Sequence, residues 1–240
     1  MRALIFGILI ISLVSCSPSD TQHEPNPIVA AFPVPSQPES PPEVEDPLPL
    51  LPSIDYDTTQ WTELMRLDTA FVIDLRYATD NNFVDTIMYD CGRCFLRPRV
   101  AQAVLEAQKE LQEQGYRLMM LDCYRPRPVQ WRLWKKVPDP RFVSDPIKGS
   151  MHNRGAAVDL TLADADGHEL DMGTPFDFFG PEAYPAYTAF PDSILERRKL
   201  LSETLTRHGF RAIRTEWWHF AFVGGGYALA DWEWECEGIR

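Results

Sequence analysis

Two short motifs most constrain what this chain can fold into, because each pairs a histidine with a carboxylate. The first is S-M-H-N-R-G-A-A-V-D-L over residues 150–160, in which His152 and Asp159 stand seven positions apart. The second is E-W-W-H, in which Glu216 stands three positions before His219. Two imidazoles and one carboxylate suit a zinc ion (Zn²⁺) and leave a fourth position for water. The fold must therefore bring two distant segments to one point.

The spacing within each motif predicts its local geometry. Residues seven apart on a straight strand point to opposite faces, so His152 and Asp159 can share a metal only if the chain bends between them. Gly155 and the small residues after it make such a bend feasible. We expect a strand over 157–162 that carries Asp159. The E-x-x-H spacing suits one face of a helix, whereas the aromatic residues around it favour a strand, and both remain open.

The first fifty or so residues are unsuited to a packed core. Residues 3–14 form an apolar run that is short for a membrane span and typical of a secretory signal segment. It ends in L-V-S-C, which resembles a bacterial lipobox and predicts a signal peptide over 1–16 with lipid attached to Cys16; a buried cysteine is the alternative. Residues 17–52 are rich in proline and predict a disordered tether. One catalytic domain is therefore expected over 53–240.

Charge and cysteine content narrow the partners and the compartment. The formal net charge of -12 argues against binding nucleic acid. Export would place the other cysteines where disulfides persist. These are Cys91, Cys94, Cys123 and Cys236. Four cysteines allow three complete pairings, and the sequence does not choose among them. C-G-R-C has no second C-x-x-C to complete a zinc knuckle, and it does not follow a strand and open a helix as a thioredoxin-like redox pair does. Structural disulfides or buried thiols are therefore expected.

The pattern of apolar residues predicts an α+β domain with a mainly antiparallel sheet flanked by helices. The expected helices cover 61–67, 98–114, 128–136 and 194–208, and the expected strands cover 71–77, 117–121, 157–162 and 216–223. Pro126 disfavours helical angles at Arg125, which therefore lies at a strand-to-helix turn. Residues 164–168 contain Asp-Gly and predict a hairpin turn rather than a calcium loop. The histidines not expected to bind metal are His23, His168 and His208.

The two histidine motifs resemble the zinc motifs of the VanX-type D-alanyl-D-alanine dipeptidases, in the zinc D,D-peptidase superfamily that includes hedgehog-like domains. The resemblance continues in D-L-R-Y-A-T at 74–79, D-C-Y-R-P at 122–126 and M-G-T-P-F-D at 172–177. It covers nearly all of 53–222, in order. It implies a hedgehog-like or D,D-peptidase-like fold and the hydrolysis of D-alanyl-D-alanine to two D-alanines, in cell-wall peptide turnover or salvage.

The resemblance also implies roles for individual residues. The implied zinc ligands are His152, Asp159 and His219. The implied catalytic residues are Glu216, as the general base for the attacking water, and Arg125, which would face the developing oxyanion. The implied substrate-binding residues are Asp177, which would accept the free amino group, and Tyr77 and Ser150, which would line the pocket. Cys123 departs from the family, which often has a small residue there.

Two other functions remain open from the sequence. A D,D-carboxypeptidase acting on muropeptide stems would use the same chemistry, and the depth of the pocket would distinguish it. A non-catalytic cell-wall-binding protein could keep zinc as a structural staple, but closed structural sites normally use four side chains, and only three obvious ligands are present. The expected location is the periplasmic side of the cell envelope, anchored by lipid at Cys16. Ser17 in place of an aspartate favours the outer membrane, if the host has one.

Overall fold

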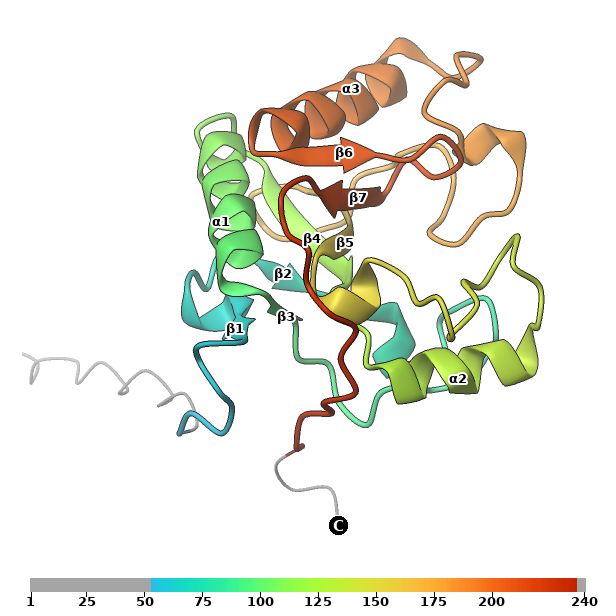
Figure 1. The fold of residues 1–240 in the computed structure, drawn as a ribbon. Helices are drawn as coiled ribbons and strands as arrows, with labels where there is room; N and C mark the ends of the chain where they lie inside the picture. Colours follow the sequence, from blue (N-terminus) through green and yellow to red (C-terminus); the bar gives the residue numbers. More distant parts are fainter. Residues whose placement is uncertain (1–52, 237–240) are drawn as a thin grey trace, which may run out of the picture. The chain divides into compact units, whose positions relative to one another are not determined.

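A five-stranded sheet forms the centre of the structure, a computed structural model that describes residues 53–236 (Figure 1). In spatial order its strands are β2 (Val72–Ile73), β4 (Arg117–Asp122), β5 (Ala157–Ala163), β7 (His219–Phe222) and β6 (Phe210–Ala212). Strands β2 and β4 run parallel, and the other neighbours run antiparallel. The expected α+β class with a mainly antiparallel sheet is confirmed. The expected signal peptide, Cys16 and the tether lie outside the described residues.

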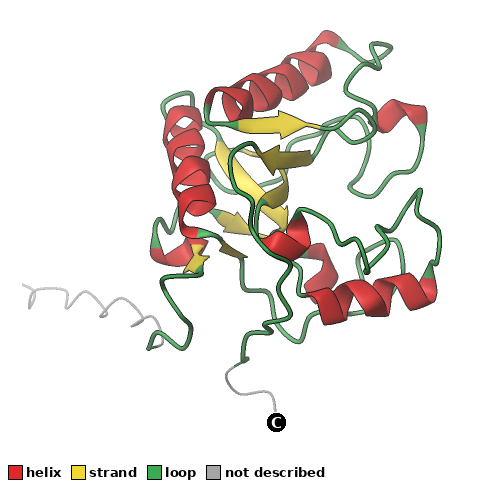
Figure 2. Ribbon diagram, in the orientation of Figure 1, coloured by secondary structure: helices red, strands yellow, loops and turns green. Residues whose placement is uncertain are grey.

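Three α-helices accompany the sheet: α1 (Pro98–Gln112), α2 (Arg127–Lys136) and α3 (Asp192–Arg207). Helices α1 and α3 pack against the sheet and against each other, whereas α2 lies apart from both (Figures 1 and 2). The buried positions of α1 recur at the helical period and include Val100, Val104, Ala107 and Leu111. All three helices were expected at nearly these bounds. Within residues 53–236, no helix has both the length and the apolar character needed to cross a bilayer.

The central strand β5 determines where the charged groups of the domain can lie. All seven of its residues are buried, and six of them carry no formal charge, Asp159 being the exception. Burying a carboxylate is costly unless cations or hydrogen-bond donors surround it. The side chains that surround Asp159 on the adjacent strands must therefore supply cations or hydrogen-bond donors.

The expected helix over 61–67 is wrong. Strand β1 (Thr62–Glu63) instead pairs with β3 (Phe95–Leu96), and a 3-10 turn, η1 (Leu64–Arg66), follows. Side-chain contacts explain the difference, since the Glu63 carboxylate accepts hydrogen bonds from Arg93 and Arg66. Long-range pairing thus outweighs a weak local helical pattern.

Two expected strands are shorter than predicted. The strand expected over 71–77 ends at Ile73, and a 3-10 turn, η2 (Arg76–Ala78), follows, so Tyr77 lies on a turn. This turn is held by Arg76, whose guanidinium reaches Asp74 and Glu169. At the second motif, β7 begins only at His219, and the three residues before it form a loop. Neither the helix nor the long strand considered for E-W-W-H is present.

The domain has two disulfides, one of which fixes the C-terminal end of the described chain, here called the C-terminal strap (residues 227–236). Cys91 bonds Cys236, and Cys94 bonds Cys123, which resolves the open pairing in favour of structural disulfides. In the strap, Trp232 stacks beside Trp61, and its carbonyl oxygen accepts a hydrogen bond from the Tyr124 hydroxyl. The strap therefore adds an aromatic cluster to the edge of the domain, which the sequence pattern did not indicate.

The expected hairpin turn after β5 is confirmed. Ala163 pairs with Glu169 in antiparallel fashion, and Gly167 adopts a positive φ of 88°. One carboxylate oxygen of Asp164 accepts the amides of Asp166 and His168. The polar groups here therefore stabilise a turn.

The bend expected between His152 and Asp159 is also confirmed. A 3-10 turn, η3 (His152–Arg154), ends at Gly155, which has a φ of 66° in the left-handed region. A Cβ atom at this position would lie 2.5 Å from a ring carbon of Trp61. Gly155 is therefore required both for its backbone angle and for the space it leaves.

We predict that Gly155→Ala destabilises the domain more than Gly115→Ala does. Gly115 also has a positive φ, of 81°, but a Cβ there would meet nothing within 4 Å. The control thus isolates the backbone cost of about 1–2 kcal/mol, and the clash at Gly155 adds about 1–3 kcal/mol. Urea unfolding of both variants measures the difference. Equal losses of unfolding free energy would contradict the close approach of Trp61.

Candidate metal centre and active site

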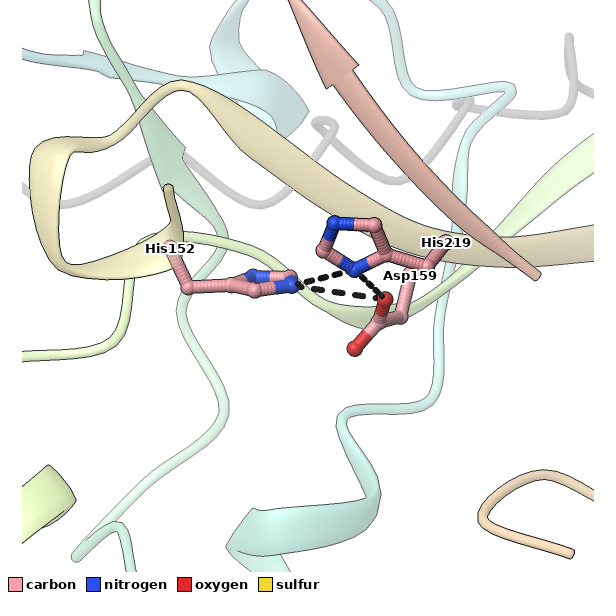
Figure 3. Close-up of side chains that lie close together, drawn as sticks. All are labelled: His152, Asp159 and His219. Atoms are coloured by element: carbon pink, nitrogen blue, oxygen red, sulfur yellow. Dashed lines mark hydrogen bonds and ion pairs between the residues drawn. The ribbon is translucent and has the colours of Figure 1, made fainter. Parts of the chain in front are cut away.

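Three side chains of the two motifs converge on one point, as Figure 3 shows. His152 Nε2 lies 3.1 Å from His219 Nδ1 and 3.3 Å from Asp159 Oδ1, and His219 Nδ1 lies 2.9 Å from the same oxygen. A tetrahedral zinc ion with bonds of about 2.0–2.1 Å separates its ligand atoms by about 3.3 Å. The spacing of these donor atoms therefore fits a zinc ion.

The sheet register and the Gly155 bend produce this convergence. Asp159 on β5 stands opposite His219 on β7, so their side chains emerge side by side. On the other flank Asp159 pairs with Asp122, where an irregularity interrupts the register of β4. His152 approaches from η3, outside the sheet. Two neighbouring strands and one turn thus supply the three candidate ligands.

A hydrogen bond to the backbone sets which nitrogen of His152 is free. Its Nδ1 lies 2.7 Å from the carbonyl oxygen of Cys123, which can only accept a hydrogen bond, so Nδ1 carries the proton. The lone pair of Nε2 then points at Asp159 and His219. A backbone carbonyl that accepts the other ring N–H in this way is typical of histidines that bind metals.

The charges at the cluster favour a bound cation. Burial alone would raise the pKa of Asp159, but His152 and His219 outweigh it and hold the pKa well below its usual value. Burial lowers the pKa of His152, but the Asp159 and Asp122 carboxylates together raise it by more. Asp159 therefore stays ionised, and its negative charge attracts a proton or a metal ion to the same place.

Arg125 is held rigidly beside the cluster, at the strand-to-helix turn expected for it. Its Nε and Nη2 donate to one oxygen of Asp122 at 3.0 and 2.6 Å, and its Nη1 donates to Gln130 at 3.1 Å. The other oxygen of Asp122 accepts the Tyr89 hydroxyl at 2.6 Å. Burial lowers the pKa of Arg125, but Asp122 and the other acidic groups around it together raise it by more, so the guanidinium stays charged.

We predict that Asp122→Ala strongly destabilises the domain, because it leaves the buried Arg125 charge without its partner. Breaking a buried pair in this way costs about 3–5 kcal/mol. Asp231→Ala is the matched control, since Asp231 also binds an arginine, Arg127, through two hydrogen bonds but at the exposed surface. Thermal unfolding compares the two. Similar small shifts in Tm for both variants would contradict a structural role for Asp122.

All the residues to which the resemblance assigned a role line one pocket of about 350 Å³. They are Tyr77, Arg125, Ser150, His152, Asp159, Asp177, Glu216 and His219. This volume is at the small end of the range for ligand sites, about 300–1,000 Å³. Phe142 and Phe179 also line the pocket, and the centroids of their rings lie 4.6 Å apart. The sequence pattern did not indicate either residue.

Glu216 lies in the loop before β7, with one carboxylate oxygen 3.9 Å from His219 Nδ1. Burial raises the pKa of Glu216 above its usual value, and the charge of Asp159 raises it further. A carboxylate with a raised pKa is a better proton acceptor near neutral pH. Glu216 can therefore exchange a proton with a group bound next to the metal ligands.

Asp177 presents a buried carboxylate to the same pocket. It adopts a φ of 58°, which aspartate tolerates better than most residues. The Tyr77 hydroxyl donates to Asp177 Oδ2 at 2.9 Å, and no lysine or arginine within the described residues forms an ion pair with Asp177. Burial raises the pKa of Asp177 well above its usual value, and Asp159 adds to this. A cation that entered the pocket would pair with the Asp177 carboxylate and offset the cost of burying its charge.

Ser150 contacts η3, here called the metal turn because it carries the candidate ligand His152, through its neighbour Asn153. The Ser150 amide and hydroxyl donate to Asn153 Oδ1 at 2.8 and 3.1 Å, and Asn153 Nδ2 donates to the carbonyl oxygen of Arg125 at 2.8 Å. The backbone of Ala230, in the C-terminal strap, donates to the carbonyl oxygen of Asn153. Asn153 and Asp122 were not identified from the sequence, although both stand inside the motifs quoted for the resemblance.

A His/Asp/His cluster with an acid and a guanidinium at the same pocket defines a metal-dependent hydrolase centre. Comparison with known proteins agrees with this class. The chain belongs to the D-ala-D-ala dipeptidase family of peptidases, whose family model matches residues 57–234.

Individual relatives of the chain are named D-alanyl-D-alanine dipeptidases. The D-alanyl-D-alanine dipeptidase of Escherichia coli (strain K12) is 37% identical over 181 residues, which are 75% of this chain and 94% of the relative. That of Enterococcus faecalis is 29% identical over 175 residues, 64% of this chain and 87% of the relative. Among solved structures, the vancomycin resistance D,D-pentapeptidase VanY is 16% identical in sequence, with a TM-score of 0.38. The match covers 55% of this chain and 74% of the VanY chain. That structural agreement is too low to add to the assignment.

Proposed function

We propose that this chain is a zinc dipeptidase that hydrolyses D-alanyl-D-alanine to two D-alanines. The observation that supports this most directly is the convergence of His152, Asp159 and His219 beside Glu216 in one small pocket. Within residues 53–236, the donor group at this pocket consists of those three ligands. A closed structural zinc site normally has four side-chain ligands, so a catalytic site is the better fit.

The residues around the cluster divide the chemical work. Zinc held by the three ligands would supply a Lewis acid and lower the pKa of a coordinated water. Glu216 accepts the proton of the attacking water and returns it to the leaving amine. Arg125, kept in place by Asp122, stabilises the negative charge that develops on the carbonyl oxygen. Each of these roles requires the side chain to face the pocket, as all of them do.

Asp177 provides the preference for a dipeptide. The ammonium group of a free dipeptide would pair with the Asp177 carboxylate, whereas a longer chain would leave it facing a neutral amide. Discrimination by leaving a buried polar group unpaired can be large. The small volume of the pocket and the contact between Phe142 and Phe179 also favour a short substrate over a muropeptide stem.

We predict that Glu216→Gln removes turnover but keeps the metal. The amide retains the size of the side chain but cannot accept a proton, so kcat should fall by about 10²–10⁴-fold. Zinc content, measured by atomic emission, should stay at the wild-type value, whereas His219→Ala should lose zinc and activity together. Glu216→Gln with wild-type turnover would exclude Glu216 as the base.

We predict that Asp177→Asn weakens the hydrolysis of D-alanyl-D-alanine without weakening that of its N-acetylated form. Loss of the charge partner should lower kcat/KM for the free dipeptide by about 10²-fold. The acetylated dipeptide and a pentapeptide stem have no ammonium at that position, so their rates should not fall. Equal effects on all three substrates would exclude Asp177 as the ammonium site, and preferential cleavage of the stem by the parent enzyme would indicate the carboxypeptidase.

We also propose that the enzyme is exported to the cell envelope and anchored there by lipid at Cys16. In the envelope it would salvage dipeptide or take part in cell-wall turnover. The L-V-S-C sequence supports the anchor, and the two disulfides of the domain suit an oxidising compartment. Cys16→Ser should therefore move the protein from the membrane fraction to the soluble fraction of the producing cells. Unlipidated wild-type protein in the cytosol would contradict this location.

A further inference from the structure

The segment that carries Asp177 has little regular structure of its own. We call residues 172–182 the Asp177 loop. It follows the hairpin after β5 and ends within the short turn η4 (Pro181–Ala183), and residues 172–180 form neither helix nor strand. The bond from Tyr77 fixes the Asp177 carboxylate, but the loop also needs something to hold its ends.

Arg198 on α3 holds both ends of the Asp177 loop. Its Nε donates to the carbonyl oxygen of Met172 at 2.7 Å, and its Nη1 donates to the carbonyl oxygen of Glu182 at 2.9 Å. The two ends therefore bind a single planar group, whose rigid fork presents both donors at once. Loops of this length with adjacent ends form compact surface units that often carry function.

The surroundings of Arg198 suit positioning better than stabilisation. The residue is 7% exposed, and its charge lies near the rings of Phe190 at 4.7 Å and Trp217 at 5.5 Å. No carboxylate pairs with it within the described residues, and its Nη2 has no hydrogen-bond partner. Burial lowers the pKa of Arg198 to about 10. Burying a cation without a direct carboxylate partner is costly, and the two carbonyl bonds and the aromatic contacts are what offset that cost.

A second contact connects the same loop to the catalytic segment. Trp217 follows Glu216 directly, and its indole nitrogen donates to the Thr174 hydroxyl at 2.8 Å. Trp217 also packs against the Arg198 guanidinium. The Arg198 side chain thus lies where the Asp177 loop, α3 and the segment before β7 meet.

We infer that Arg198 is a positioning residue for substrate selection, which holds the Asp177 carboxylate at a fixed place relative to the metal ligands. The inference rests on the proposed role of Asp177 as the ammonium acceptor. When the two carbonyl bonds are lost, the loop moves away and the free dipeptide binds more weakly. The zinc ligands and Glu216 belong to other segments, so the metal and the chemical step are retained.

The test compares Arg198→Met with Lys199→Met. Methionine keeps the packing against Phe190 and Trp217 but cannot bond the carbonyls, and Lys199 is an exposed neighbour on the same helix. Chymotrypsin cleavage within the Asp177 loop, at the partly exposed Phe178 and Phe179, reports the position of the loop without any use of activity. We expect Arg198→Met to be cleaved at least about tenfold faster and to raise KM for D-alanyl-D-alanine at least about tenfold, since the loss of even one charged hydrogen bond implies a change of that size.

The other readouts separate positioning from a general loss of structure. Zinc content should stay unchanged and kcat should change much less than KM, and Lys199→Met should match the parent throughout. If Arg198→Met fails to fold, Arg198→Lys, which keeps the charge but not the fork, should show the same changes to a smaller extent. Unchanged cleavage, or faster cleavage with unchanged KM, would overturn the inference. If the parent enzyme does not hydrolyse D-alanyl-D-alanine, the proposed function fails, while the cleavage comparison still decides whether Arg198 holds the loop.

Discussion

The burial of the Asp159 carboxylate in the central strand is the constraint on which the rest of the structure depends. Strand β5 is buried over its whole length, so a charge there is tolerated only if cations or donors face it from the adjacent elements. His219 comes from the neighbouring strand and His152 from the turn after the bend at Gly155. The same electrostatic demand that keeps Asp159 ionised also makes this point of the sheet attractive to a divalent metal.

Residues next to the pocket hold the side chains that line it in place through further hydrogen bonds. Asp122, the next residue in the cross-strand row, binds Arg125 and lies near the His152 ring. Asn153 connects the metal turn to the backbone of Arg125 and to the C-terminal strap. Contacts of this kind fix the orientation of the side chains that point into the pocket. The disulfides that secure the strap and its neighbours therefore stabilise the region that holds the metal turn.

The sequence predicted the features of the fold that are determined within short segments of the chain. The bend at Gly155 and the three α-helices follow from residue type and local periodicity, and the structure has them as expected. The two histidine motifs lie together in it, as the metal-site prediction requires. The helix expected over 61–67 was wrong because cross-strand pairing with residues 95–96 decides that segment. Asp122, the strap and the bonds of Arg198 were missed because each depends on contacts between segments far apart in sequence, which periodicity does not encode.

The most direct test of a metal centre with three side-chain ligands is X-ray absorption spectroscopy of zinc in the purified protein. The structure predicts one zinc per chain with two imidazoles and no sulfur in its coordination shell, and a single imidazole remaining in any zinc that His219→Ala still binds. A coordination shell that contains sulfur, or one with the same number of imidazoles with and without His219, would contradict a metal centre formed by His152, Asp159 and His219.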